Sequence, residues 1–400
     1  MNSRILDRYD HPDHFLPLLP VQSLARLQES SRPVVEASLK LQGALAPATR
    51  AELQELVRAM NSYYSNRIEG QSTHPLNIER ALRSDFSLSP DIARRQRLAK
   101  AHIEAEMALE GLGLSEPRAF HSDTLKRAHF ELYTRLDGAD RLSDQGVEVL
   151  PGEWRDCGVA IHRHEPPPAQ ALSAFLARAD AFYVKGWGLD GLLAAVASAH
   201  HRLIWVHPFL DGNGRASRLQ LHLMLQRLTA GLWSVNRGLA RDREGYYLHL
   251  AEADMHRQGA LDGRGNLSEK TLTRWCEFFI ATCLDQVRFM TELLAPETLS
   301  ARLAAWVKIR QEELKGDGYR EEAILPLQHI ALSGPVSRAD FTRMTGLGPS
   351  SARKIISRLL SDGLLKSDSH KGLLRIGFPL QALHILFPRL YPEAAGIVDE

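Results

Sequence analysis

The chain has 400 residues, of which 44% are hydrophobic and 24% are charged, a composition typical of a folded protein with two or three domains. Its 49 Lys and Arg residues nearly balance 48 Asp and Glu residues, so the net charge of +1 excludes a general attraction to nucleic acid or membrane surfaces. Because the sequence has neither a long apolar segment nor a secretory signal pattern, we expect no membrane association and a cytoplasmic location.

Apolar residues recur at three- and four-residue spacing through most of the chain and predict a mostly α fold. In chain order, the predicted helices span 36–42, 49–65, 91–110, 119–135, 169–184, 189–205, 213–229, 243–253 and 269–294. Residues 153–165 differ, because their polarity alternates between turn-forming prolines, and they predict a short β-hairpin. We divide the chain into an N-terminal helical region, a helical core and a C-terminal unit, at 1–110, 111–300 and 301–400.

The segment 207–218, HPFLDGNGRASR, joins two predicted helices and is suited to binding an anion. Gly212 and Gly214 allow the backbone to approach a phosphate, and the first N–H groups of the following helix lack helical partners. Arg215 and Arg218 lie three residues apart on that helix and can bind successive phosphates. The segment therefore predicts a phosphate cradle at a helix N-terminus.

Two further side chains of this segment are suited to proton transfer and to metal binding. His207 can accept a proton near neutral pH, and the Asp211 carboxylate can bind a hard cation. Together with the cradle they predict a phosphoryl-transfer site. We expect Phe209, between them, to anchor the loop in the core.

These twelve residues resemble the HPFxDGNGRxxR motif of the Fic family, with every fixed position present. The resemblance extends over the surrounding helices and implies a helical Fic core in which the hairpin 153–165 is a flap that pairs with a target chain. Fic enzymes mostly transfer AMP from ATP to a protein hydroxyl. The resemblance therefore implies transfer of AMP from Mg·ATP to a Ser, Thr or Tyr of a target protein and of the enzyme itself.

The resemblance also implies a role for each residue. His207 is the catalytic base, and Asp211 holds Mg²⁺. Arg215 and Arg218 hold the β- and γ-phosphates. The residues assigned to nucleotide binding are Gly212, Asn213, Gly214, Arg215, Arg218, Ile161, His162, Tyr246 and Tyr247. Because adjacent helical side chains point in different directions, we expect at most one of the two tyrosines to stack on the base and the other to lie in the core.

An upstream segment, Ser65 to Gly70, reads SNRIEG and resembles the inhibitory motif [S/T]xxxE[G/N] of Fic proteins with an N-terminal inhibitory helix. It implies that Glu69 pairs with Arg218 and occupies the fork that the γ-phosphate requires. Gly70 is expected to end the helix and aim Glu69 at the core. If this helix moves, Glu69 can instead position water, so removal of AMP from a modified target is a second implied activity.

The C-terminal unit resembles a winged helix-turn-helix. Its predicted helices span 324–334, 337–345 and 349–362, and two strands follow around the turn 369–372. Between Pro335 and Phe378 we count eight basic and three acidic residues, a local charge of +5. Ser350, Ser351, Arg353 and Lys354 lie early on the third helix, where groove contacts are made. Binding of DNA and a docking or dimerisation role are both open.

Two alternatives to an adenylyltransferase are a DNA-binding regulator that senses nucleotide without turnover and a Fic transferase that uses another nucleotide donor. The presence of His207, Asp211, Arg215 and Arg218 favours an enzyme over a sensor, because a sensor has no use for the base. A homodimer is expected from the family resemblance alone.

Overall fold

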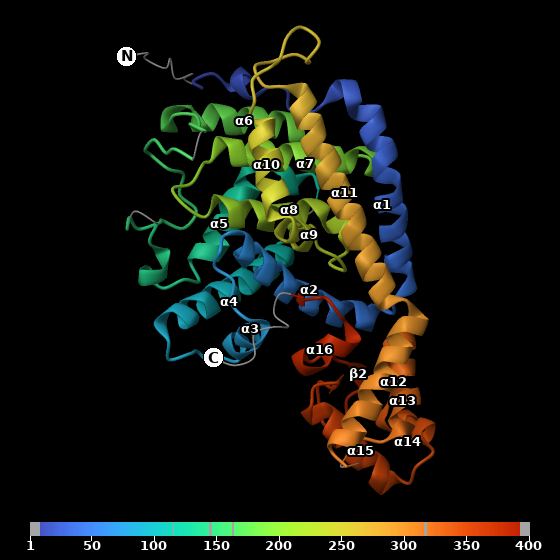
Figure 1. The fold of residues 1–400 in the computed structure, drawn as a ribbon. Helices are drawn as coiled ribbons and strands as arrows, with labels where there is room; N and C mark the ends of the chain where they lie inside the picture. Colours follow the sequence, from blue (N-terminus) through green and yellow to red (C-terminus); the bar gives the residue numbers. More distant parts are fainter. Residues whose placement is uncertain (1–8, 115, 144–145, 162–163, 316–317, 393–400) are drawn as a thin grey trace.

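The computed structural model describes residues 9–114, 116–143, 146–161, 164–315 and 318–392. The described chain is almost entirely helical and elongated, with a large helical bundle at one end and a smaller C-terminal unit at the other (Figure 1). The mostly α fold predicted from the periodicity is confirmed. None of the helices in the described ranges is long and apolar enough to cross a membrane.

The helices of the bundle are, in chain order, α1 (Leu24–Ala44), α2 (Pro47–Ile68), α3 (Pro75–Leu82), α4 (Pro90–Gly111), α5 (Ser122–Tyr133), α6 (Leu172–Tyr183), α7 (Leu189–Val206), α8 (Asn213–Thr229), α9 (Val235–Arg241), α10 (Arg243–Ala253) and α11 (Glu269–Leu294). The C-terminal unit contains α12 (Pro296–Glu313), α13 (Ile324–Ser333), α14 (Arg338–Thr345), α15 (Pro349–Ser361), β1 (Leu365–Lys366), β2 (Arg375–Ile376) and α16 (Leu380–Leu386).

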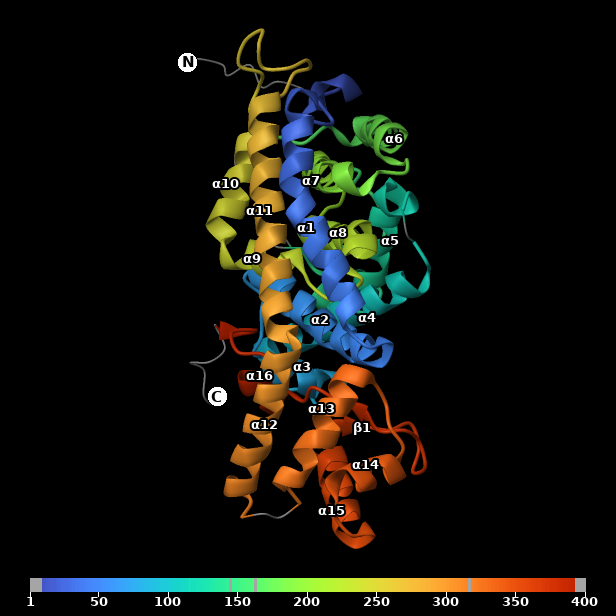
Figure 2. The same cartoon turned by 90° about the vertical axis from the view of Figure 1, so that its right-hand side faces the viewer.

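Helices α7 and α8 form the centre of the bundle. The α7 sequence is apolar or small on nearly every side, and almost all its residues are buried, as expected for a helix surrounded by protein. Helices α1, α6 and α11 pack against α7, and α5 packs against α8 (Figures 1 and 2). The loop between these two central helices is the segment 207–212, so the predicted phosphate cradle is rigidly supported.

Helix α1 is longer than the sequence predicts, because it continues through Pro33. A proline inside a helix removes one hydrogen bond and usually ends the helix. Here Pro33 is exposed, while Leu27, Val34 and Leu41 on the opposite side are buried along α7 and α11. Burial of this apolar stripe offsets the cost of the proline. The N-terminal region thus packs as part of the bundle.

The predicted hairpin at 153–165 is reduced in the structure. Its described residues form one isolated bridge, in which Ile161 and His164 exchange two backbone hydrogen bonds of 2.9 and 2.8 Å. The other described residues of the segment form an irregular loop that is held by side chains, and we call residues 153–168 the flap loop. Among the described residues of this segment only one pair is bridged, so the prediction of a hairpin over 153–165 is wrong in its extent.

The C-terminal unit follows the predicted order of elements closely. Helices α14 and α15 are joined by the short turn 346–348, and β1 pairs antiparallel with β2, with Leu365 opposite Ile376. A further bridge joins Val336 to Leu374. The order of helices and strands in this unit agrees with the predicted order, and its assignment as a winged helix-turn-helix stays a prediction.

Candidate active site

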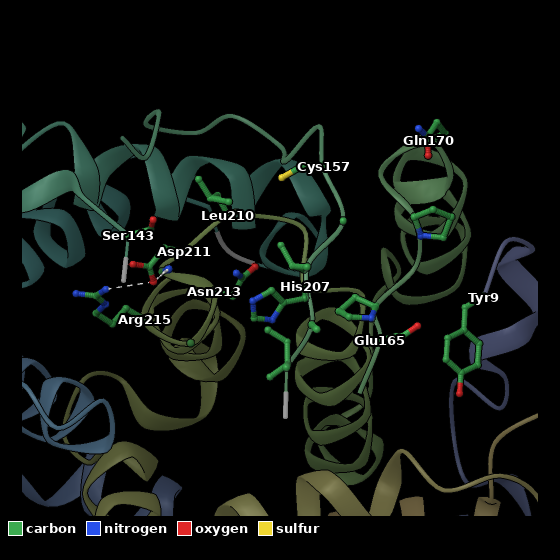
Figure 3. A pocket seen from close by; sticks show the side chains of 18 of the residues that line it. Tyr9, Ser143, Cys157, Glu165, Gln170, His207, Leu210, Asp211, Asn213 and Arg215 are labelled. Atoms are coloured by element: carbon green, nitrogen blue, oxygen red, sulfur yellow. Dashed lines mark hydrogen bonds and ion pairs between the residues drawn. The ribbon is translucent and has the colours of Figure 1, made fainter. Parts of the chain in front are cut away.

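A cavity of about 960 Å³ opens between the flap loop and the segment 207–215. Figure 3 shows His207 near its middle, with Asp211, Asn213 and Arg215 on one side and Glu165 on the other. Glu69, at the end of α2, also lines it. The structure therefore brings together the predicted base, metal ligand, cradle and inhibitory carboxylate in one cavity.

The loop between α7 and α8 is fixed by its own side chains. The Asn213 amide donates to the Phe209 carbonyl and accepts from the Phe209 N–H, both at 2.9 Å. Phe209 is fully buried and stacks on His129 with ring centroids 3.9 Å apart, which confirms its predicted role as an anchor. Because the Asn213 side chain is occupied in this way, only its backbone N–H remains to bind an anion.

His129, on α5, supports the loop and was not singled out by the sequence. Its Nδ1 accepts the Gly152 N–H at 2.9 Å, so Nε2 carries the proton and donates to the Asp211 carbonyl at 3.1 Å. Burial lowers the pKa of His129 to about 3, which keeps this hydrogen-bonding pattern at neutral pH. The sequence pattern that could have indicated this role is the four-residue spacing of His129 and Tyr133, which both lie on the buried face of α5.

The His207 imidazole is held in its neutral form. Burial, together with the nearby charges of Arg155 and His164, lowers the pKa of His207 to about 3, and Glu69 opposes this shift. Its backbone caps α7 in the left-handed region at φ 48°, which directs the ring into the cavity away from the helix axis. A neutral imidazole can accept a proton without first losing one.

This depressed pKa predicts a measurable pH response. The His207 ring should stay neutral as the pH falls from about 8 to about 5, because both limits lie above a pKa of about 3. Since the unfolded chain binds this proton below its ordinary pKa of 6.5 and the folded chain does not, folding stability should fall as the pH drops below that value. An NMR titration checks the ring directly, and a midpoint near 6.5 in the folded protein would contradict the burial argument.

The predicted anion cradle at the start of α8 is filled by the Glu69 carboxylate. A Cβ atom added to Gly214 would lie 2.3 Å from Glu69 Oε1, so only glycine permits this approach. The adjacent N–H groups at the helix N-terminus carry partial positive charge and favour an anion there. Glu69 therefore occupies the place that the sequence assigns to a phosphate.

Arg218 is held by the end of α2 on two sides. Its Nη2 donates to Glu69 Oε1 at 2.6 Å and to the Ser65 carbonyl at 3.0 Å, and its Nε donates to Ser65 Oγ at 2.9 Å. The guanidinium is only 1% exposed. Burial alone would raise the pKa of Glu69, but Arg218 and Arg215 outweigh it and lower that pKa. The predicted ion pair is present, with Ser65 completing it.

Gly70 ends α2 in the way that the sequence predicts. Its φ is +73°, in the left-handed region that favours glycine. The Gln71 N–H bonds to the Asn66 carbonyl at 2.8 Å and the Gly70 N–H to the Arg67 carbonyl at 3.0 Å, which is the Schellman pattern. This termination turns the chain away from the core and leaves Glu69, the capping residue, directed at Arg218.

The central part of the chain is similar to known Fic proteins. Residues 119–225 match the Fic/DOC family. This Fic/DOC segment contains α5, α6, α7, the motif 207–218 and most of α8. A protein adenylyltransferase Fic from Nematostella vectensis is 28% identical over 204 residues, which are 48% of this chain and 42% of that protein. Another from Culex quinquefasciatus is 31% identical over 142 residues, 31% of this chain and 27% of that protein.

The chain thus spans less than half the length of the curated relatives it matches. Among solved structures, a Fic family protein from Desulfovibrio desulfuricans G20 aligns with a TM-score of 0.50 at 20% identity, over 88% of this chain and 95% of that chain. Fic-1 (aa134–508) from C. elegans aligns with a TM-score of 0.52 at 19% identity, over 68% and 74% of the two chains. The fold around the Fic/DOC segment is therefore shared with Fic proteins.

Arg215 and Ile161, two further residues that were assigned to nucleotide binding, both line the cavity. Arg215 donates to Tyr133 Oη and to Gln71 Oε1, both at 3.2 Å, and its Nη2 lies 3.8 Å from Asp211 Oδ1. Ile161 lines the cavity from the flap loop, whereas His162 lies outside the described residues. The cavity wall thus contains Arg215 from the motif 207–218 and Ile161 from the flap loop.

Tyr246 and Tyr247 separate as expected for neighbours on a helix. Tyr246 is buried in the core, 3.1 Å from His200 Nε2 through its hydroxyl. Tyr247 is 42% exposed and donates to the Ile68 carbonyl at 3.2 Å. This second tyrosine is therefore bonded to the last residue of α2, immediately before Glu69.

Four of the eight basic residues counted in the C-terminal unit form ion pairs with described acidic residues. Lys366 Nζ lies 2.6 Å from Glu52 and 2.6 Å from Glu55, both on α2, and Arg375 pairs with Asp368 and Glu52. Arg343 and Arg358 also pair within the unit, with Asp340 and Asp362. In contrast, Arg353 and Lys354 are exposed on α15 and form no ion pair with any described residue. The local charge counted along the sequence overstates the free basic surface.

Proposed function

We propose that the protein is an autoinhibited adenylyltransferase that transfers AMP from Mg·ATP to a hydroxyl of a target protein. The observation that carries this proposal is the pairing, in one cavity, of a neutral His207 with a helix N-terminus that already holds a carboxylate. A site that accepts the Glu69 anion there is suited to a phosphate in the same place. The relatives named as protein adenylyltransferases point to the same chemistry.

The reaction follows from the residues present. His207 accepts the proton of the target hydroxyl as its oxygen attacks the α-phosphorus of ATP. A new oxygen–phosphorus bond forms, the bond from the α-phosphorus to the bridging oxygen breaks, and pyrophosphate leaves with both electrons of that bond. The N–H groups of α8 and the two arginines stabilise the charge that accumulates on the phosphate oxygens.

Asp211 fits a magnesium ion that is held mainly by water and substrate. Its carboxylate lines the cavity and is about one-third exposed, and its Oδ1 accepts the Gly212 N–H. Mg²⁺ typically takes one or two protein carboxylates beside phosphate oxygens and water. The ion would neutralise charge on the phosphates during transfer.

Arg218 should be essential for tight binding of ATP once Glu69 is removed. Its guanidinium would then be free to bind the γ-phosphate, and one charge-assisted hydrogen bond contributes about 1.5–3 kcal/mol. Arg218→Ala in the Glu69→Gly background should therefore weaken ATP binding about 10- to 150-fold by calorimetry. Arg237→Ala, which removes a buried arginine outside the cavity, is the control. Unchanged ATP affinity in the Arg218 variant would exclude its phosphate role.

The donor nucleotide is tested by offering ATP, GTP, CTP and UTP in turn. After incubation of the Glu69→Gly variant with each donor and Mg²⁺, intact mass spectrometry should detect an adduct of AMP on the protein or an added target. An adduct from UTP alone would instead favour a Fic transferase with another donor. No adduct from any donor would favour the nucleotide-sensing regulator.

Self-modification and a homodimer remain secondary predictions. Removal of AMP by a water that Glu69 positions is a third, and it is supported by the position of Glu69 in the same cavity as His207. The wild type should then release AMP from a modified target, and Glu69→Gln should not. Equal release by both proteins would remove Glu69 from this reaction.

We also propose that α15 binds duplex DNA, because its exposed Arg353 and Lys354 follow the turn of a helix-turn-helix. Binding should weaken with salt, and Arg353→Ala with Lys354→Ala should reduce the salt slope by about one for each lost phosphate contact. Lys371→Ala, on the hairpin turn, is the matched control for loss of charge. Equal affinity and slope in all variants would favour a docking role for this unit.

A further inference from the structure

We propose that Arg155 is the positioning residue that fixes His207 and the flap loop as one unit, so that the base and the target-binding segment keep a constant relation. The proposal rests on the function proposed above. The sequence motifs assign no role to Arg155, which lies in the predicted hairpin 153–165 but outside the motif 207–218 and the segment 65–70.

The Arg155 side chain ties together three separate parts of the chain. Its Nε donates to the His207 carbonyl at 2.8 Å, and its Nη1 donates to the Cys157 carbonyl at 2.8 Å. Its Nη2 donates to the Pro167 carbonyl and, at 3.4 Å, to the Val206 carbonyl. The backbone adds a fourth link, from the Arg155 N–H to the Pro208 carbonyl at 2.9 Å.

These acceptors explain why an arginine is needed here. The carbonyls of Val206 and His207 lie at the C-terminal end of α7, where helical carbonyls lack partners and a cation is favoured. Cys157 and Pro167 lie near the two ends of the flap loop. A planar guanidinium with five N–H donors can reach all of them at once, whereas a lysine offers a single point charge.

Arg155 has no compensating carboxylate in the part of the chain that the structure describes, although it is only 5% exposed. Burial correspondingly lowers the pKa of Arg155. A buried cation that is satisfied by carbonyl groups alone is a costly way to stabilise a loop. Its position beside the strained backbone of His207, at φ 48°, points to a role in orienting that residue.

Arg155 also acts on the His207 ring through its charge. Among the described residues, the charges of Arg155, His164 and Glu69 act most strongly on this ring, and Glu165, Asp211 and Arg215 also line its cavity. Arg155 and His164 favour the neutral imidazole, and Glu69 opposes them. Loss of the Arg155 charge should therefore raise the pKa of His207, a change that a general loss of stability does not produce.

The test compares Arg155→Met and Arg155→Lys with Arg237→Met, all in the Glu69→Gly background. Arg237→Met is a matched control, because Arg237 is equally buried and also donates to a backbone carbonyl, that of Arg389, away from the cavity. We expect Arg155→Met to lower kcat about 100-fold while the KM for ATP is unchanged, since misplaced catalytic groups cost about this much. Arg155→Lys should lower kcat by a smaller factor, and Arg237→Met should leave kcat unchanged.

Two readouts do not depend on transfer. Hydrogen exchange of the peptides covering 157–161, 164–168 and 206–208 should quicken in Arg155→Met but not in Arg237→Met. The His207 pKa measured by NMR should rise only in Arg155→Met, because Arg155→Lys keeps the charge. If the Glu69→Gly parent transfers no AMP, the proposed function fails while these readouts still decide the role of Arg155. Exchange and a His207 pKa in Arg155→Met equal to those of the control would overturn it. If Arg155→Met does not fold, hydrogen exchange of the same peptides in Arg155→Lys decides.

Discussion

Glu69→Gly should raise the initial rate of AMP transfer about 10- to 150-fold over the wild type at subsaturating ATP. The change removes the carboxylate that fills the cradle above Gly214 and bonds to Arg218, and the freed guanidinium gains a charge-assisted bond to the nucleotide of about 1.5–3 kcal/mol. Transfer is measured as label incorporated from α-labelled ATP.

The matched control is Arg67→Gly, which weakens the same last turn of α2 but keeps the Glu69 carboxylate. It should leave the low activity of the wild type nearly unchanged. Glu69→Gln should activate as Glu69→Gly does, because the carboxamide cannot form the ion pair. If neither Glu69 variant transfers AMP faster than the wild type, the inhibitory role of this residue is wrong.

His207→Ala in the Glu69→Gly background should lower transfer by about 10²–10⁴-fold, the usual contribution of a general base. Binding of ATP, measured by calorimetry, should be preserved, because the phosphate ligands lie on α8 and not on this side chain. His370→Ala, on the exposed hairpin turn of the C-terminal unit, should retain full transfer. Transfer by His207→Ala at the parent rate would exclude this residue as the base.

The sequence predicted the site best where function depends on a short contiguous segment. The residues from His207 to Arg218 form a loop and helix whose own turns bring the base, carboxylate and cradle together. The contact between Glu69 and Arg218 was predicted from the resemblance of residues 65–70 to the inhibitory motif, and in the structure both Ser65 and Glu69 bond to Arg218.

The sequence failed where long-range packing decides the outcome. Helix α1 continues through Pro33 because α7 and α11 bury its other face, and no local pattern contains that information. His129 and Arg155 act on the loop through hydrogen bonds to backbone groups, which leave no periodic pattern in the sequence.

The C-terminal unit shows a different limit. Counting charges along the chain gave a strongly basic surface, but Glu52 and Glu55, some 300 residues earlier, neutralise Lys366 in space. Glu52 and Glu55, near the start of α2, pair with the hairpin residue Lys366, and Glu69, which caps the other end of this helix, pairs with Arg218. The distribution of charge over the surface depends on the fold. Counts along the sequence approximate it only when the two members of each ion pair lie close together in the sequence.

The most direct measurement of the central claim follows two labels. Glu69→Gly and Glu69→Gly/His207→Ala are each incubated with Mg²⁺ and ATP that is labelled at either the α- or the γ-phosphate, and label on protein is counted. AMP transfer predicts label from α-labelled ATP alone, and only when His207 is present. Label retained from the γ-phosphate, or α-label that persists without His207, would contradict the account.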